Sequence, residues 1–206
     1  ETGLIVPLGE WVLTEALRQN RLWQEAGRPV VPISVNLSPR QFRQPGLADT
    51  VRRILLETGQ PAHFLELEIT ESSLMHDAAE TISILNELAA LGVRIAIDDF
   101  GTGYSSLSYL KRFHVHKLKI DQSFVCDVTT DADDVAIVTA VVGLADSMGL
   151  ETIAEGVERL DQLNALIKLG CHKFQGFLFS RPLPAEAADS LFTPTIPQGM
   201  QQNIFF

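Results

Sequence analysis

The sequence predicts an α/β fold of the TIM-like (β/α)8-barrel type, with about six of the eight strands inside the 206 residues. Short strand-like runs alternate with longer helix-like runs, and repeated βα units form parallel sheets. Polar groups also stand at or near the carboxyl ends of the strand-like runs, and those ends form the mouth of a barrel. An open doubly wound sheet is the alternative, but its strands read as continuous apolar runs because both faces are buried.

The elements follow one another at regular intervals. A helix is expected from Leu8 to Ala26, and Ser38 and Pro39 should begin another that continues, broken near 45–46, to about Thr58. The further helices are expected at Ala78 to Leu91, Ser106 to Phe113, Asp134 to Met148, Leu160 to Leu169 and from Ala185. The strands are expected at Val31 to Leu37, Leu65 to Thr70, Arg94 to Asp98, Lys117 to Asp121, Glu151 to Glu155 and His172 to Gly176. Residues 1–194 should form one domain and 195–206 a loose tail.

The strand patterns favour the barrel. In the run from Leu65 to Thr70, the apolar residues share one face and the polar residues share the other. Four other strand-like runs carry polar groups at or near their ends, namely Asn36, Asp98, Glu155 and Gln175. Since an eight-stranded barrel typically needs about 250 residues, we expect about two βα units to precede Glu1.

The composition limits the classes of partner and compartment. Acidic residues exceed basic ones, 26 against 16, and the formal charge of −10 argues against binding to duplex DNA. Cys126 and Cys171 lie far apart and are expected to be reduced structural thiols of a cytoplasmic protein, whose parent protein could be membrane-anchored. The apolar run from Val135 to Leu150 is interrupted by Asp146 and is too short to span a membrane, so we expect a buried helix.

Four carboxylates and one amide recur at the strand ends: Asn36, Glu68, Asp98, Asp99 and Glu155. Gathering like charges is costly unless a multivalent cation offsets the repulsion. Because every ligand atom would be oxygen, Mg²⁺ or Mn²⁺ fits better than Zn²⁺. Two such ions a few ångströms apart suit in-line displacement at phosphorus.

A structural alternative exists for each of these positions. Glu66 and Glu68 could face solvent on an antiparallel sheet, and Asp98–Asp99 could form a turn. Lys119 could orient a water or neutralise a phosphate oxygen, or it could lie on a solvated face. Asn36 could stand at the start of a helix. The functional interpretation gains weight because all these residues recur at the same structural position.

At these residues the chain resembles the EAL family of cyclic-di-GMP phosphodiesterases, a family of TIM-like barrels with two divalent metal ions. The matching segments span nearly the whole chain in the correct order and together are very specific. They are Ser34–Ser38, Glu68–Glu71, Asp98–Ser106, Lys117–Asp121, Ala154–Glu158 and Gln175–Phe177.

The resemblance implies hydrolysis of cyclic di-GMP to linear pGpG. It implies metal ligands at Asn36, Glu68, Asp98, Asp99 and Glu155. It assigns catalytic roles to Lys119, Asp98, Asp99 and Glu155, and substrate contacts to Asp121, Glu158, Gln175, Gly176 and Phe177. Glu71 matches the residue that anchors the Asp98–Ser106 loop, a segment linked in the family to dimerisation and activity.

One departure from the family pattern concerns the first βα unit. Its name-giving Glu-Ala-Leu motif is expected before Glu1, and the chain is expected to lack it. The implied partners are cyclic di-GMP, a second copy of the chain, and attached sensory or GGDEF domains. The alternative is a catalytically inactive module that binds cyclic di-GMP or dimerises.

Overall fold

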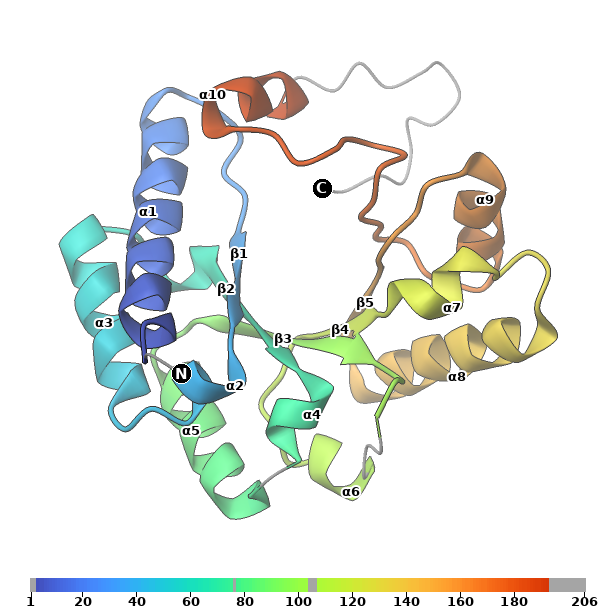
Figure 1. Cartoon of the computed structure of the whole chain (residues 1–206), viewed down its shortest axis with the longest axis horizontal. Coiled ribbons are helices and arrows are strands. Elements are labelled where there is room, and N and C mark those ends of the chain that lie inside the picture. Colours follow the sequence, from blue (N-terminus) through green and yellow to red (C-terminus); the bar gives the residue numbers. More distant parts are fainter. Residues whose placement is uncertain (1–2, 76, 104–106, 193–206) are drawn as a thin grey trace. The chain divides into compact units, whose positions relative to one another are not determined.

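Parallel strands organise the computed structural model, which describes residues 3–75, 77–103 and 107–192. Five strands are hydrogen-bonded in the order β1-β2-β3-β4-β5, and pairing is parallel between β1 and β2 and between β4 and β5. Their bounds are β1 Ile33–Leu37, β2 Leu65–Thr70, β3 Arg94–Phe100, β4 Lys117–Ile120 and β5 Glu151–Ala154 (Figure 1). The prediction of parallel βα units is therefore confirmed.

Helices follow the strands as the sequence indicates, with ends shifted by a few residues. The bounds of the longer ones are α1 Ile5–Glu25, α3 Leu47–Thr58, α5 Ala78–Ala90, α8 Ala132–Met148 and α9 Leu160–Lys168. The short ones are α2 Pro39–Phe42, α4 Glu71–Leu74, α6 Leu107–Leu110, α7 Gln122–Cys126, α10 Ala185–Ala188 and the 3-10 turns η1 Ala62–Phe64 and η2 Asp189–Phe192. Of these, α4, α7 and both 3-10 turns were not expected from the sequence.

The chain divides into two units, each with its own packing. The first comprises residues Glu1–Ile97 and Gly103–His116, and the second comprises Asp98–Thr102 and Lys117–Phe206. In the first unit, α1 and α3 lie side by side, and α1 packs on β1 (Figure 1). Leu17 of α1 and Leu67 of β2 are fully buried. Burying such a side chain contributes roughly 1.5–3 kcal/mol to stability, which holds these helices against the strands.

In the second unit, α8 packs on β4 and β5. Its buried residues, Val138, Val141, Val142 and Ala145, recur at helical spacing, so one face of the helix is in the core and the other is solvated. The expected helix is confirmed at this position, but it is buried along one face only and not throughout, as was expected. Among the described residues, no helix is both long enough and apolar enough to cross a bilayer.

The expectation of a sixth strand, from His172 to Gly176, is wrong. Only Phe174 forms a parallel bridge there, with Ala154 of β5. The ladder stops because Gly156 adopts a φ of 68°, which turns the chain after β5 out of the extended conformation. The next bond between the two segments, from the backbone N–H of Val157 to the carbonyl of Gln175, is displaced by one residue from the regular ladder, so the pairing ends there.

Two other expectations change or fall outside the structure. Both cysteines are free, as expected, but only Cys171 is buried; Cys126 is exposed because it ends the short helix α7. The expected tail, 195–206, lies outside the described residues, as do Tyr104, Ser105 and Ser106 of the predicted loop.

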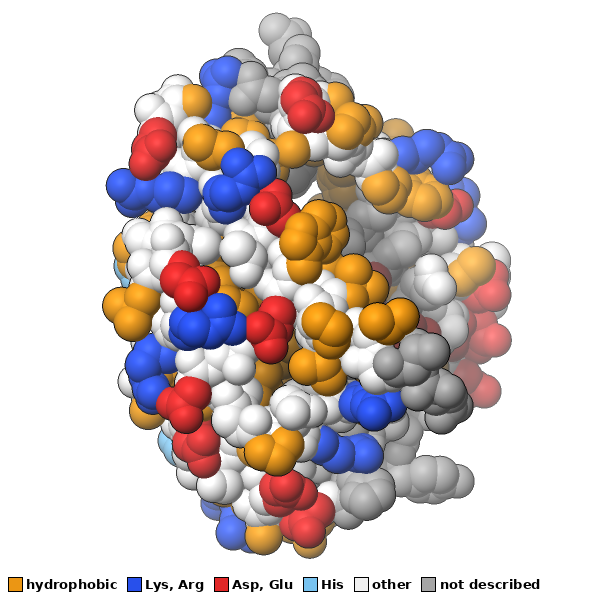
Figure 2. Space-filling model, turned by 60° about the vertical axis from the view of Figure 1, so that its left-hand side comes forward, with side chains coloured by type: hydrophobic (Ala, Val, Ile, Leu, Met, Phe, Trp, Pro, Cys, Tyr) orange, Lys and Arg blue, Asp and Glu red, His pale blue; other side chains and the backbone are white. Residues whose placement is uncertain are grey.

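Hydrophobic side chains gather on the face of the first unit that carries α1 (Figure 2). The exposed ones on or next to the first turns of this helix are Leu4, Ile5, Leu8, Trp11 and Val12, and Trp11 is 61% exposed. Apolar patches that remain exposed on one face are typical of contact surfaces.

Candidate active site

Lys119 is the buried cation at the centre of the candidate site. It lies on β4 and is only 3% exposed. Its Nζ is 2.9 Å from Oδ1 of Asp98 and 2.7 Å from Oε1 of Glu155. Because a buried ammonium is retained only where opposite charges compensate it, the two carboxylates fix both its charge and its position. The alternative in which Lys119 lies on a solvated face is therefore wrong.

Asp98, Asp99 and Glu155 form a cluster of carboxylates. One oxygen from each lies within 4.8 Å of the others. Asp98 and Asp99 are consecutive residues of β3, which would ordinarily direct their side chains to opposite faces. Asp99 instead adopts a φ of 53°, a left-handed conformation that Asp tolerates better than most residues. This local turn brings both carboxylates into one cluster.

The electrostatics of the cluster are visible at Asp99. Burial raises the pKa of its carboxyl above the ordinary value, and the charges of Asp98 and Asp121 raise it further, while Lys119 opposes the shift. The raised pKa means that ionising Asp99 costs more free energy in this cluster than it would in water. A divalent cation would remove that penalty.

Strand pairing fixes the positions from which the site residues project. The N–H of Glu155 donates to the carbonyl of Ile120 at 3.1 Å, which holds the end of β5 beside the end of β4. Asp121 begins α7, and its carboxylate accepts the N–H of Ser123 at 3.0 Å. The site thus sits where β3, β4 and β5 end, as predicted for a barrel mouth.

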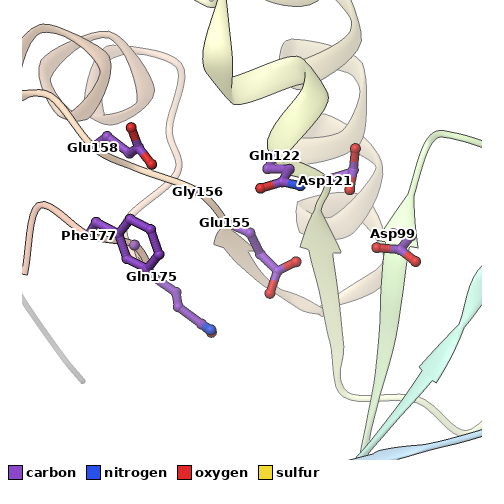
Figure 3. A pocket seen from close by; sticks show the side chains of 9 residues that line it. Asp99, Asp121, Gln122, Glu155, Gly156, Glu158, Gln175 and Phe177 are labelled. Carbon is purple, nitrogen blue, oxygen red and sulfur yellow. The ribbon is translucent and has the colours of Figure 1, made fainter. Parts of the chain in front are cut away.

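A pocket of about 280 Å³ lies over these strand ends in the second unit. Its lining is largely polar: Asp99, Asp121, Gln122, Glu155, Gly156, Glu158, Gln175, Gly176 and Phe177 (Figure 3). All five residues expected to contact substrate line it. Gln122 was not among the expected site residues, although its place directly after Asp121, at a strand end, was a usable signal.

The wall of the pocket opposite the carboxylates is built around Gly176. A Cβ atom at Gly176 would lie 2.2 Å from the carbonyl oxygen and 2.3 Å from the nitrogen of Val157, so only glycine fits. Next to it, the ring of Phe177 is 49% exposed, and the Arg181 guanidinium lies 4.6 Å from its centroid. Phe177 therefore presents an aromatic ring at the pocket, supported by a cation–π contact.

The other predicted ligands lie in the first unit. Asn36 of β1 and Glu68 of β2 are register partners near the carboxyl ends of their parallel strands. Glu68 is 7% exposed, and Glu66 is buried with hydrogen bonds from Ser34 and Arg94. The alternative in which Glu66 and Glu68 face solvent on an antiparallel sheet is wrong, because β1 and β2 are parallel and both glutamates are buried.

Glu71, also in the first unit, contacts the loop that it was predicted to anchor. Its side chain is buried at the start of α4. A Cβ atom built on Gly103 would lie 2.8 Å from Oε1 of Glu71, which shows how closely the loop backbone approaches the carboxylate. Residues 104–106 of the loop lie outside the described residues.

Contrary to expectation, the letters Glu-Ala-Leu do occur in the chain, at Glu15–Leu17. They lie inside α1, and the carboxylate of Glu15 is exposed and bound by Arg18 at 2.7 Å. A helical, solvent-exposed glutamate does not have the strand-end setting of the family's metal ligand. This triplet is therefore not the motif that names the family.

The donor set suits hard divalent cations. Three carboxylates meet in one cluster, and neither histidine nor thiolate takes part in it. Such oxygen ligands suit Mg²⁺ and Mn²⁺. The candidate ligands within this cluster are Asp98, Asp99 and Glu155.

Comparisons with known proteins agree with this geometry. A family model described as "EAL domain" matches residues 1–182. The bifunctional diguanylate cyclase/cyclic di-GMP phosphodiesterase MucR of Pseudomonas aeruginosa is 52% identical over 187 residues, which are 90% of this chain and 27% of MucR. In general the chain spans about a quarter of the length of the curated relatives that it matches.

Solved structures give the same result. The phosphodiesterase part of MucR, in complex with c-di-GMP, superimposes with a TM-score of 0.88 over 90% of this chain and 75% of that one, at 52% identity. A manganese/c-di-GMP complex of Klebsiella pneumoniae BlrP1 gives a TM-score of 0.77 at 32% identity, over 86% of this chain and 45% of that one. The chain therefore belongs to the EAL domain family and has its TIM-like α/β fold.

Proposed function

We propose that this chain hydrolyses one phosphodiester bond of cyclic di-GMP to give linear pGpG, with two divalent ions, Mg²⁺ or Mn²⁺, as cofactors. The observation that carries the proposal is the buried Lys119 ammonium, held between Asp98 and Glu155 beside the pocket. The similarity to MucR, whose name includes this activity and whose solved structure contains c-di-GMP, supports it.

We propose that Lys119 acts on the reacting groups directly. Asp98 and Glu155 accept from its ammonium at 2.9 and 2.7 Å, so the cation is fixed beside the carboxylate cluster. From this position an ammonium N–H can orient a water or a phosphate oxygen. Bound divalent ions supply Lewis acidity and a water of lowered pKa. The protein's own contribution is to hold charge and donors fixed where negative charge develops on the phosphate.

The proposed metal ligands are Asp98, Asp99 and Glu155, with Asn36 and Glu68 completing the set. The first three are supported by the 4.8 Å cluster and by the raised pKa of Asp99. The other two are supported by their register pairing on parallel strands and by the burial of Glu68. Manganese in the BlrP1 complex agrees with a hard divalent ion.

The proposed substrate contacts are Asp121, Glu158, Gln175, Gly176 and Phe177. The ring of Phe177 can stack on a purine, an interaction that tolerates any base. A carboxylate such as Glu158 can accept from the adjacent N–H donors on the pairing edge of a guanine. The pocket therefore offers complementary groups to the base, and the phosphate would lie toward the carboxylate cluster beside Lys119.

Further proposals concern the regulation and setting of the domain. We propose that Glu71 anchors the Asp98–Ser106 loop, that the chain forms homodimers, and that sensory or GGDEF domains are attached to it. MucR, a relative about four times as long as the matched region, supports the last point. We propose a cytoplasmic location, which the two free cysteines support. We also propose that the chain does not bind duplex DNA, because the formal charge is −10.

The direct test is turnover of cyclic di-GMP, read as pGpG by chromatography with Mn²⁺ or Mg²⁺ present. It should be run on the 206-residue chain and, where the gene codes for further residues, on the full-length product. We expect product that disappears on chelation of the metal. Binding of cyclic di-GMP without hydrolysis in both samples would instead support the inactive binding module.

The Asp98→Asn variant tests the assignment of the site. It retains the size of the side chain but removes a charge that Lys119 and a metal ion would use, so turnover should fall at least about a hundredfold. The matched control is Asp146→Asn on the exposed face of α8, which should leave turnover unchanged. Near-normal activity of Asp98→Asn would contradict the proposed mechanism.

A further inference from the structure

Gln162 connects two parts of the second unit that carry pocket residues. It is the third residue of α9 and is only 2% exposed. Its Oε1 accepts the backbone N–H of Glu158 at 3.0 Å and that of Arg159 at 2.9 Å. Its Nε2 donates to the carbonyl of Cys126, the last residue of α7, at 3.0 Å. One buried amide therefore joins the segment after β5 to the end of α7.

Each of the two connected parts contributes to the pocket. The segment from Gly156 to Glu158 forms one side, and Asp121 and Gln122 at the start of α7 form another (Figure 3). Between them the pocket continues into a neighbouring cavity of about 360 Å³, which Gln162 also lines. Gln162 thus bridges these two sides of the pocket and holds Glu158 at a fixed distance from α7.

Glu155 and Glu158, the two glutamates that follow β5, are held by different contacts. Glu155 is held through its N–H to Ile120 and through its carboxylate to Lys119. Glu158, which follows the turn at Gly156, has its backbone N–H bound by Gln162. We therefore expect a change at Gln162 to move the backbone of Glu158 and to leave the contacts at the carboxylate cluster in place.

We propose that Gln162 is a positioning residue that sets the affinity for substrate by fixing Glu158 against α7. This inference rests on the proposed function, since it takes the pocket to be the site for a guanine nucleotide. A simpler role is also available, because Gln162 accepts the backbone N–H of the N-cap residue Arg159, as the third residue of a capping box does, and would stabilise the start of α9 anyway. A positioning role affects the affinity for the ligand, whereas a capping role affects only the stability of α9.

The test compares Gln162→Met with Gln162→Glu. Methionine has a similar size but cannot accept from Glu158 and Arg159 or donate to Cys126. Glutamate still accepts both N–H groups and is favoured at this position of a capping box, but it loses the donor to Cys126. The exposed Asn164→Leu on the same helix is the control for replacing an amide with an apolar side chain.

We expect Gln162→Met to raise both KM and the dissociation constant for cyclic di-GMP about tenfold, a change of the size of one ordinary hydrogen bond, because Glu158 is no longer held in place for the ligand. Its kcat should change less than about threefold, because contacts at the carboxylate cluster remain. Gln162→Glu should recover most of the affinity, and Asn164→Leu should match the wild type. Affinity should be measured directly, by calorimetry with Ca²⁺ in place of the catalytic metal.

Amide hydrogen exchange provides a second readout that does not depend on activity. The amides of Glu158 and Arg159 should exchange faster in Gln162→Met and be protected again in Gln162→Glu. A lower Tm with unchanged KM, affinity and amide exchange would reduce Gln162 to a helix cap and overturn the proposal. A wild-type protein that neither binds nor hydrolyses cyclic di-GMP would refute the proposed function, while amide exchange would still test whether Gln162 anchors Glu158.

Discussion

Replacing Lys119 with methionine tests whether charge compensation holds the site together. The change removes a cation that is 4% exposed in its side chain and lies within 3 Å of Asp98 and Glu155. Asp98 and Glu155 then lose the cation that lies within 3 Å of both. Breaking a buried ion pair from one side costs about 3–5 kcal/mol, which is a large part of the roughly 5–15 kcal/mol that stabilises a typical domain.

The assay is urea unfolding at pH 7.5 in the presence of a chelator. Lys119→Met should lower the free energy of unfolding by about 3–5 kcal/mol. Added Mn²⁺, or a pH low enough to protonate the carboxylates, should narrow the gap to the wild type, because each removes the uncompensated charge. Turnover should fall more than the affinity for cyclic di-GMP.

The control is Lys168→Met on the exposed side of α9, which should change stability by less than about 0.5 kcal/mol. A loss below about 1 kcal/mol for Lys119→Met, with no response to Mn²⁺, would refute the reasoning, because it would mean that solvent already screens the two carboxylates.

Two further predictions follow from the local geometry. Gly176→Ala should destabilise the protein by about 3 kcal/mol, because its Cβ would overlap the backbone of Val157; Gly143→Ala, in open space within α8, should instead raise the Tm, and equal effects of the two would contradict the packing argument. Because the folded-state pKa of Asp99 is raised, the ion-free protein should lose stability as the pH rises through that pKa, and Mn²⁺ should raise the Tm more at pH 8 than at about pH 4, near the ordinary carboxyl pKa. The same Mn²⁺ effect at both pH values, in the wild type and in Asp99→Asn, would show that protons and metal do not compete for this carboxylate.

Local signals account for the parts of the fold that could be predicted. Ser38 and Pro39 begin α2 because a side-chain cap and a fixed φ act over a few residues. The alternation in β2 and the polar ends of β1, β3 and β5 predicted parallel strands with a polar edge. These signals depend on neighbours in sequence, so they can be read without tertiary structure.

Other features depend on contacts between distant segments and could not be predicted in this way. The sixth strand is lost because Gly156 turns the chain away from the ladder, and the burial of Glu66 depends on Ser34 and Arg94 from neighbouring strands. Gln162 has no motif that marks it as a tether, because its partner Cys126 lies 36 residues away.

The acidic residues that recur at several strand ends are enough to predict a site for divalent cations, because such a cation offsets the repulsion between like charges. How the charges balance follows from the folded chain. Lys119 alternates with Leu118 and Ile120 like any half-exposed strand residue, and its ion pairs with Asp98 and Glu155 become visible only when these residues are brought to it from other strands. The physical reason is that charge compensation in a buried site depends on distance in space, which sequence spacing does not fix.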